Sequence, residues 1–203
     1  EFSAKQISQK VFLDFFNEPQ DSLRRKRDGV YDSRIFEIEN RKIQIIALDT
    51  RFSRSALMGT EGKYARSYGR EATVLSETQW AWLEEQFMQP ADVRILMSSI
   101  QVINVDGGWE KWMNFPLERE RLFSLINKTR ANGVIILSGD RHFAQLSAMN
   151  AWIGYPLYEL TVGQFNKFNS KLPNAKNRFL MNDKIDPQAG FGLMTIDIEP
   201  ENS

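Results

Sequence analysis

Three nearly continuous apolar runs, separated by amphipathic segments, constrain the fold of this chain most strongly. The runs cover residues 43–48, 93–103 and 134–137. Continuous apolarity is typical of strands that are buried on both faces of a sheet. Helix signals lie between the runs. Ser76 stands three residues before Gln79, as in a capping box, and Pro116 suits a first helical position. The order strand, helix, strand, helix, strand predicts an α/β architecture.

Weaker patterns complete the predicted organisation. Apolar residues recur at helical spacing over residues 4–16, and a strand over 34–39 precedes the first apolar run across a short turn at Asn40. Two further strands are expected over residues 155–161 and 191–198. Polar loops are expected over residues 17–34, 51–75 and 162–188. The final strands favour an antiparallel or mixed sheet beside the parallel one.

Composition excludes several classes of protein. The 203 residues contain 26 basic and 26 acidic side chains, so no overall charge attracts nucleic acid or a membrane surface. Cysteine is absent, which removes disulfides and thiolate metal ligands, and no apolar stretch is long enough to span a bilayer. Because Glu1 does not resemble a natural start, we expect an N-terminal portion of the same domain to precede this chain.

The clearest chemical signal follows the third apolar run. The strand ends in Ser138-Gly139-Asp140-Arg141-His142, which contains the single histidine of the chain. Sites in α/β proteins gather at strand ends, and an Asp and a His on one tight turn can both ligate a metal ion. The structural alternative is a capping aspartate and a locally hydrogen-bonded histidine.

Two other strand ends carry polar residues. Asp49 and Arg51 follow the first run; an aspartate there can bind metal, and the planar guanidinium of arginine suits phosphate. A purely structural Asp–Arg pair is an equal alternative. Gln101 lies in the second run, where it either bonds within the sheet or points into a site.

These features occur in an order and spacing that resemble the alkaline phosphatase D (PhoD-like) branch of the calcineurin-like metallophosphoesterases. The matching stretches are Phe15 to Pro19, Gly29 to Tyr31, Leu48 to Arg51, Gln79 to Leu83, Ser98 to Val102, Trp109 to Trp112, Pro116 with Glu118 and Arg119, Leu137 to Ala144, Tyr155 to Thr161, and Phe191-Gly192.

The resemblance implies a metallophosphatase-like four-layer αββα sandwich with mixed sheets, of which residues 1–203 are the C-terminal part of a single domain. It also implies a two-metal centre that makes a hydroxide nucleophile for attack on a phosphate ester. Asp140 and His142 are the implied metal ligands. The implied catalytic residues are Arg51, Gln101 and Arg141. Iron, calcium, manganese and zinc are not distinguished, and export to a secreted or periplasmic location is the family habit.

Two departures from the family pattern leave an alternative open. The early metal motifs of the family are absent, and the segment after Thr161 lacks the usual histidine. The chain is therefore either part of a metal-dependent phosphatase or phosphodiesterase, or a catalytically inactive binding or structural remnant of that fold. A metal-independent esterase built on Ser138 lacks a nucleophile elbow.

We predict that Asp49, Gln101 and His142 converge in one crevice, because each ends or follows a buried strand. We also predict an exposed apolar sheet face or an unpaired edge strand near the N-terminal helix. The three-dimensional structure tests both expectations. A position of His142 on the face opposite Asp49 would contradict the shared crevice. Complete burial of the apolar strands, with every sheet edge protected, would contradict the second expectation.

Overall fold

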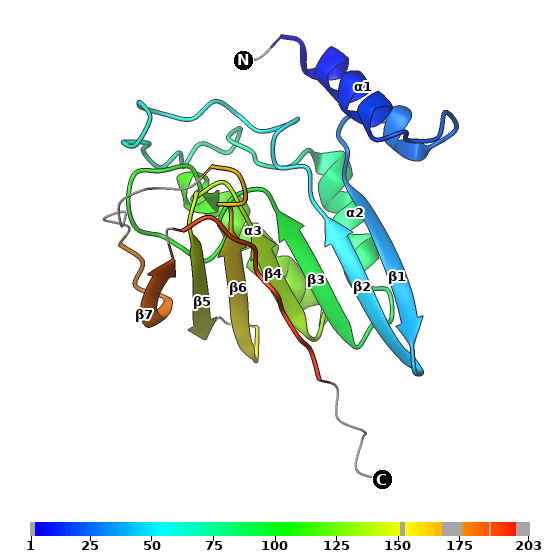
Figure 1. Cartoon of the computed structure of the whole chain (residues 1–203). Coiled ribbons are helices and arrows are strands. Elements are labelled where there is room, and N and C mark those ends of the chain that lie inside the picture. The colour runs from blue at the N-terminus through cyan, green and yellow to red at the C-terminus, as the bar shows by residue number, and fades with distance from the viewer. Residues whose placement is uncertain (1–2, 151–152, 168–175, 187, 198–203) are drawn as a thin grey trace.

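The computed structural model describes residues 3–150, 153–167, 176–186 and 188–197, and its strands form one seven-stranded mixed sheet (Figure 1). The strands are β1 (Asp32–Ile38), β2 (Arg41–Ala47), β3 (Val93–Ser98), β4 (Val134–Ser138), β5 (Ala144–Asn150), β6 (Pro156–Val162) and β7 (Leu180–Asp186). Their order across the sheet is β1-β2-β3-β4-β6-β5-β7. The central strands β2, β3, β4 and β6 are parallel, and the outer pairings are antiparallel.

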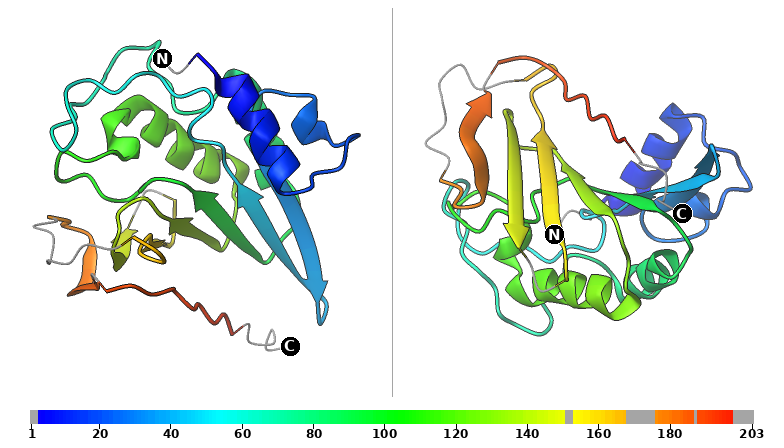
Figure 2. Two further views of the ribbon diagram at one scale, coloured as in Figure 1. Left: turned by 45° about the horizontal axis from the view of Figure 1, so that its top comes forward. Right: turned by 90° about the horizontal axis from the view of Figure 1, so that it is seen from below.

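Helices cover one face of this sheet. The helices are α1 (Lys5–Phe15), α2 (Glu77–Phe87) and α3 (Pro116–Thr129), with short 3₁₀ turns η1 (Leu23–Arg25) and η2 (Trp112–Asn114). Figure 2 shows α2 and α3 on one side of the sheet and the C-terminal segment on the other, while α1 lies beyond the ends of β1 and β2 (Figure 1). Among the described helices, none is both long and apolar enough to cross a bilayer.

The core lies between the sheet and the two covering helices. Ser76 caps α2 by accepting a hydrogen bond from the Gln79 amide at 3.2 Å, as the sequence predicts. The side chains that fill this layer from the strands and helices include Ile46, Leu96, Ile136, Trp80, Leu83, Phe87, Leu122, Phe123 and Ile126. Burial of these large apolar groups is the main favourable term that holds the two layers together.

The opposite face of the sheet is apolar and partly open. Ile45, Ile95 and Ile135 are aligned across β2, β3 and β4, and Met97 is aligned with Leu137. These side chains are only partly buried, and Met97 remains 43% exposed. The expected exposed apolar face is therefore present, and β1 forms an edge of the sheet near α1, also as expected.

Helix α1 is present where its periodicity predicts it, but its apolar side chains face outward. Ile7, Val11 and Phe15 are exposed, and Leu13 is the buried residue of the helix. The polar Gln9 faces the body instead, because its amide nitrogen donates to the carbonyl oxygens of Arg24 and Arg27. The apolar stripe therefore adds to the uncovered apolar surface.

Several boundaries differ from the sequence expectations. Strand β3 ends at Ser98 rather than near residue 103, because the following backbone bonds to side chains instead of a neighbouring strand. Strands β5 and β7 were not predicted, and residues 191–197 form no strand; residue 198 lies outside the described residues. Helix α3 ends at Thr129, and its C-cap residue Arg130 has a left-handed conformation with φ of 54°, three residues before Gly133.

The α/β class and the mixed sheet are confirmed. The described residues supply one sheet and one layer of covering helices, so the second sheet of a four-layer sandwich is not among them. The open apolar face is where such a sheet would have to pack.

A buried carboxylate joins the two covering helices. Glu118 is 7% exposed, and its Oε2 atom accepts hydrogen bonds from the Val74 and Leu75 amides, the Thr73 hydroxyl and the Trp80 indole. The start of α3 is thereby tied to α2 and to the chain that leads into it.

We predict that Glu118→Ala lowers the free energy of unfolding by about 3 kcal/mol, because several buried donors lose their acceptor. The matched control is Glu120→Ala, an exposed glutamate on the same helix, for which we expect a change within about 0.5 kcal/mol. Urea unfolding monitored by tryptophan fluorescence measures both. Equal midpoints for the two variants would contradict the assigned role.

Candidate functional site

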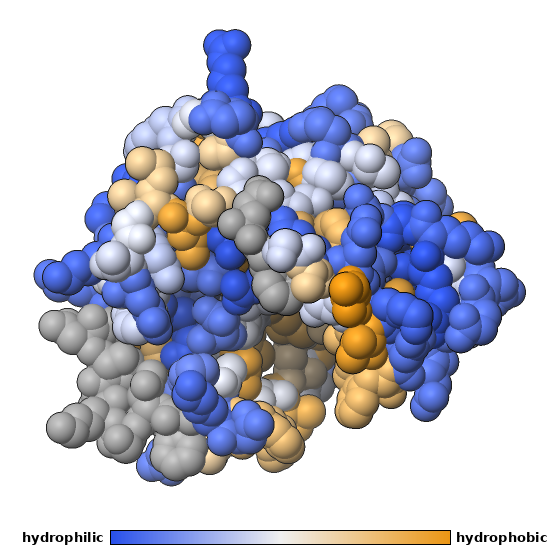
Figure 3. Space-filling model, turned by 90° about the horizontal axis from the view of Figure 1, so that it is seen from above, coloured by the Kyte–Doolittle hydropathy of each residue, from blue (hydrophilic) through white to orange (hydrophobic). Residues whose placement is uncertain are grey.

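The carboxyl ends of the parallel strands meet at one edge of the sheet. Ser98 is aligned with Ser138, and Ser138 with Thr161, so the loops that follow β2, β3 and β4 leave the sheet side by side. These loops carry the residues singled out from the sequence. Figure 3 looks onto this end of the molecule, which is mainly hydrophilic with several separate apolar patches.

Arg51 connects the loops after β2, β3 and β4. Its Nη1 atom donates to both carboxylate oxygens of Glu110, at 2.9 and 2.8 Å, and its Nη2 atom donates to Asp140 Oδ1 at 3.1 Å. Glu110 also contacts Arg54 at 3.3 Å. The Arg51 side chain is 46% exposed, so it remains accessible to an anionic ligand.

A cavity of about 470 Å³ lies beside this contact, between α1 and the loop after β2. Its lining combines cationic and apolar side chains: Lys5, Arg51, Arg54, Phe12, Phe52, Val30 and Leu48, with Asp49, Thr50 and Ser99 among the polar groups. The volume falls within the range typical of small-molecule sites.

Asp49 is committed to backbone hydrogen bonds. Its Oδ1 atom accepts from the amides of Arg51 and Phe52, and its Oδ2 atom accepts from the Val30 amide at 2.9 Å. A carboxylate that accepts three amide protons is held in place and has little capacity left for a metal ion. In this structure Asp49 therefore fixes the loop that presents Arg51.

Gln101 is fully buried within a polar network. Its Nε2 atom donates to Thr161 Oγ1 at 3.1 Å, and its Oε1 atom accepts from Asn104 Nδ2 at 3.1 Å. Thr161 in turn shares a hydrogen bond with Ser138. The network links the ends of β4 and β6 to the loop after β3, so Gln101 positions that loop and has no exposed surface to offer a substrate.

The turn after β4 has an unusual backbone. Asp140 and His142 have positive φ angles of 68° and 55°, which is uncommon outside glycine. Gly163, at the end of β6, packs against this turn: a Cβ atom there would lie 3.0 to 3.2 Å from the amide nitrogens of Asp140, Arg141 and His142. The close approach of the two segments fixes the turn.

Arg141 lies between the two candidate metal ligands but points toward aromatic rings. Its guanidinium carbon is 5.5 Å from the centre of the Trp109 ring and 5.2 Å from that of Phe143. Burial lowers the pKa of Arg141 from its usual value, although the charge of Asp140 acts in the opposite direction. Arg141 thus packs under the strand-end loops.

A buried ionisable pair holds the loop after β3. Glu159 accepts hydrogen bonds from the amides of Val102 and Ile103, at 2.7 and 2.8 Å, while Arg119 donates to the carbonyl oxygens of the same two residues. Burial raises the pKa of Glu159 and lowers that of Arg119 to about 10. The sequence signal for this pair is a carboxylate inside the apolar strand β6.

Lys111 is a second buried charge that the motif analysis did not single out. It is 2% exposed, and its Nζ atom donates to the carbonyl oxygens of Gly107 and Trp109 at 2.8 and 2.5 Å. Burial, together with the charges of Arg141 and Arg66, lowers the pKa of Lys111 from 10.5 to about 8.

The donor set falls short of a two-metal centre. Within the described residues, no group of three or more histidine, cysteine, aspartate or glutamate side chains is placed to hold a metal ion. Asp140 contacts Arg51, and His142 is the one imidazole of the chain. These two side chains can contribute to a metal site but do not fit a complete one.

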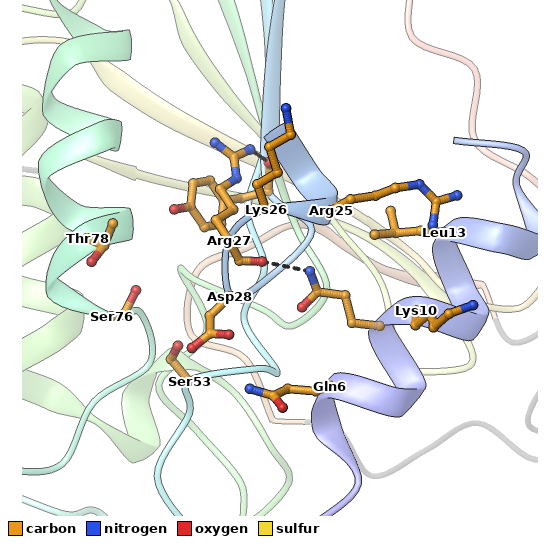
Figure 4. A pocket seen from close by; sticks show the side chains of 12 residues that line it. Gln6, Lys10, Leu13, Arg25, Lys26, Arg27, Asp28, Ser53, Ser76 and Thr78 are labelled. Carbon is orange, nitrogen blue, oxygen red and sulfur yellow. Dashed lines mark hydrogen bonds between the residues drawn. The ribbon is translucent and has the colours of Figure 1, made fainter. Parts of the chain in front are cut away.

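A larger cavity, about 660 Å³, lies between α1, residues 25–28, Ser53 and the start of α2. Figure 4 shows Asp28 and Ser53 facing the gap between α1 and α2. The arginines along it are already engaged: Arg25 pairs with Asp14, and the Arg27 guanidinium lies 3.9 Å from the centre of the Tyr31 ring. Arg25 and Arg27 are thus held by contacts within the protein.

Comparisons with known proteins identify the family to which this α/β chain belongs. A model of the PhoD-like phosphatase family matches residues 25–178. The chain therefore belongs to the PhoD-like phosphatase family.

The structural comparisons concern the fold alone. A solved structure of PhoD matches with a TM-score of 0.66 and 17% sequence identity, over 92% of this chain and 40% of that chain. A candidate 5′-nucleotidase from Staphylococcus aureus matches at a TM-score of 0.35 and 13% identity, over 81% of this chain and 31% of that one; a likeness this weak carries no argument. No curated protein sequence matches the chain.

The predicted convergence of Asp49, Gln101 and His142 is supported at the level of the backbone, since all three follow strands that end at the same edge. The contact between Arg51 and Asp140 joins the loop after β2 to the turn after β4. A shared crevice that includes the His142 side chain stays a prediction.

We predict that Lys111 makes stability depend on pH between about 8 and 10.5. In this window the unfolded chain holds the lysine proton and the folded chain does not, and stability rises with pH wherever the unfolded state binds more protons. Between pH 8 and pH 10.5, the unfolding free energy of the wild type should rise by roughly 3 kcal/mol more than that of Lys111→Met. If the stability of both proteins changed with pH in the same way, the pKa of Lys111 would not be lowered in the folded chain.

Proposed function

We propose that this chain forms part of a metal-dependent phosphoesterase that hydrolyses a phosphate monoester or diester. The observation that carries the proposal is the family match over residues 25–178, combined with an accessible arginine at the strand edge. Arg51 lies beside a cavity of about 470 Å³ and directly contacts Asp140, the first residue of the Asp-x-His turn.

Arg51 is suited to bind a substrate phosphate. Its guanidinium is planar and half-exposed, a geometry that matches two phosphate oxygens. Glu110 now accepts from Arg51, but Glu110 is also paired with Arg54 at 3.3 Å. Arg51 can therefore turn to an anion without leaving Glu110 uncompensated.

The other candidate residues have supporting roles in this proposal. Gln101 is a positioning residue, because it is buried and acts through Thr161 and Asn104. Arg141 supports the turn from beneath through Trp109 and Phe143. Asp140 and His142 remain the proposed metal contacts. Since they do not make up a two-metal centre, no step is assigned to a metal held by these residues alone.

Export from the cytoplasm, which the family resemblance implies, is part of the same proposal. The chain spans 40% of the length of the PhoD structure that it matches. The activity of the whole protein, and its choice between monoesters and diesters, accordingly extend beyond the residues described in this structure.

A catalytically inactive remnant of the fold is the second candidate function. It is favoured by one observation: the described residues do not gather three metal-ligating side chains at any point. The two candidates are separated by turnover, since a remnant would retain binding surfaces and lack chelator-sensitive hydrolysis.

We predict negligible hydrolysis of p-nitrophenyl phosphate and its bis ester by the 203-residue chain, because one imidazole and a few oxygen donors hold metal ions weakly. The product of the complete reading frame that encodes the chain is assayed in parallel, and we expect it to be active and sensitive to chelators. Turnover by the 203-residue chain that a chelator abolishes and metal restores would refute the first expectation. An inactive product of the complete reading frame, loaded with each candidate metal, would favour the remnant.

In that complete product, we predict that Arg51→Ala lowers kcat by about 100-fold, the usual effect of removing one donor to a developing anion. His142→Ala should lower kcat/KM at least as much and reduce bound metal. Because Arg51 is half-exposed, its loss should cost under about 1 kcal/mol of stability. The control is Lys63→Gln, an exposed cation in the loop after β2. Undiminished turnover in Arg51→Ala would rule out its contact with phosphate.

A further inference from the structure

A third, smaller cavity of about 200 Å³ lies between the loops after β2 and β3, separate from the strand-edge cavity. Two loops form it. The amide of Tyr64 donates to the Gly108 carbonyl, and the amide of Ser67 donates to the Asn114 carbonyl. Its lining residues are Tyr64, Arg66, Val105, Asp106, Gly107, Lys111, Met113 and Asn114. A space this small is below the usual range for organic ligands and fits a small ion.

The side chains that line this cavity carry a net positive charge. Lys111 is almost fully buried, and among the described residues no carboxylate lies within ion-pair distance of its Nζ atom. An ammonium group has three donors, of which two reach the Gly107 and Trp109 carbonyls. Arg66 lines the same cavity and donates one hydrogen bond to the Val105 carbonyl.

The acidic residue of the lining offsets the charge of Lys111 only in part: Asp106 raises the pKa of Lys111, but burial and the charges of Arg141 and Arg66 lower it further. Asp106 accepts from the guanidinium and the backbone amide of Arg178, at distances of 2.7 to 3.2 Å. These hydrogen bonds hold the pKa of Asp106 below its usual value. The Asp106 charge is thus shared with Arg178, and a buried ammonium whose charge is only partly balanced is costly unless a ligand supplies further counter-charge.

We propose that this cavity binds a phosphate oxyanion through Lys111 and Arg66. The third ammonium donor and the free guanidinium donors can both reach tetrahedral phosphate oxygens, with the charge-assisted hydrogen bonds that such oxygens favour. The ligand is either free phosphate or the terminal phosphate of a monoester. The site does not involve Arg51, Asp140 or His142, so it is independent of the proposed hydrolysis.

The test is calorimetric titration of the 203-residue chain with inorganic phosphate at constant ionic strength, with the thermal midpoint measured alongside. We expect saturable binding by the wild type, loss of that binding in Lys111→Met, and about a tenfold weaker Kd in Arg66→Ala. Arg66 is exposed, so its variant should fold even if Lys111→Met does not. A second titration uses phenyl phosphate as a competitor of inorganic phosphate. Competition would identify the terminal phosphate of a monoester as the ligand, and lack of competition would identify free phosphate.

Two controls separate this site from other cations. Lys63→Gln removes an exposed lysine from the same loop as Arg66 and should bind phosphate as the wild type does. Arg51→Ala removes the strand-edge arginine and reports any phosphate that binds there. Absence of saturable binding in the millimolar range by the wild type would overturn the proposal, as would an unchanged Kd in Arg66→Ala. A loss confined to Arg51→Ala would place the phosphate at the strand edge instead.

Discussion

The buried contact between Glu159, Arg119 and the backbone of Val102 and Ile103 is the interaction on which the candidate site depends. Glu159 satisfies the two amides and Arg119 the two carbonyls, so a segment that has left the sheet keeps all four polar groups bonded in the interior. Unpaired, such groups would be expensive to bury. The loop that follows carries both Glu110, which binds Arg51, and Lys111.

The loop after β3 thereby joins several parts of the molecule. Gln101 ties its start to Thr161 on β6, and Glu110 ties its middle to Arg51 after β2. Trp112, in η2, donates its indole hydrogen to Ser98 at the end of β3. A polar network that is satisfied at every member confers rigidity and a unique arrangement, which is what a site assembled from separate loops requires.

The molecule also has apolar surface that its own core does not cover. One face of the sheet and the outer stripe of α1 are both apolar and incompletely covered, with Ile7 and Phe15 exposed. Large uncovered apolar patches mark surfaces that pack against something else. The open face of the sheet is where the second sheet of the predicted four-layer sandwich would have to pack.

The sequence by itself determined the α/β class, the parallel central strands and the position of the Asp-x-His turn, because long apolar runs and helix caps are local signals. It also predicted α2 with its Ser76 cap and the hairpin of β1 and β2. Only the tertiary structure decided that Asp49 and Gln101 face inward toward backbone and side-chain partners, and that Arg51 reaches Asp140 across 89 positions of chain. Local sequence patterns also did not predict strands β5 and β7, the outward orientation of the apolar side chains of α1, or the burial of Lys111. Each depends on which groups meet after the chain has folded, and residue type and spacing do not encode those distant partners.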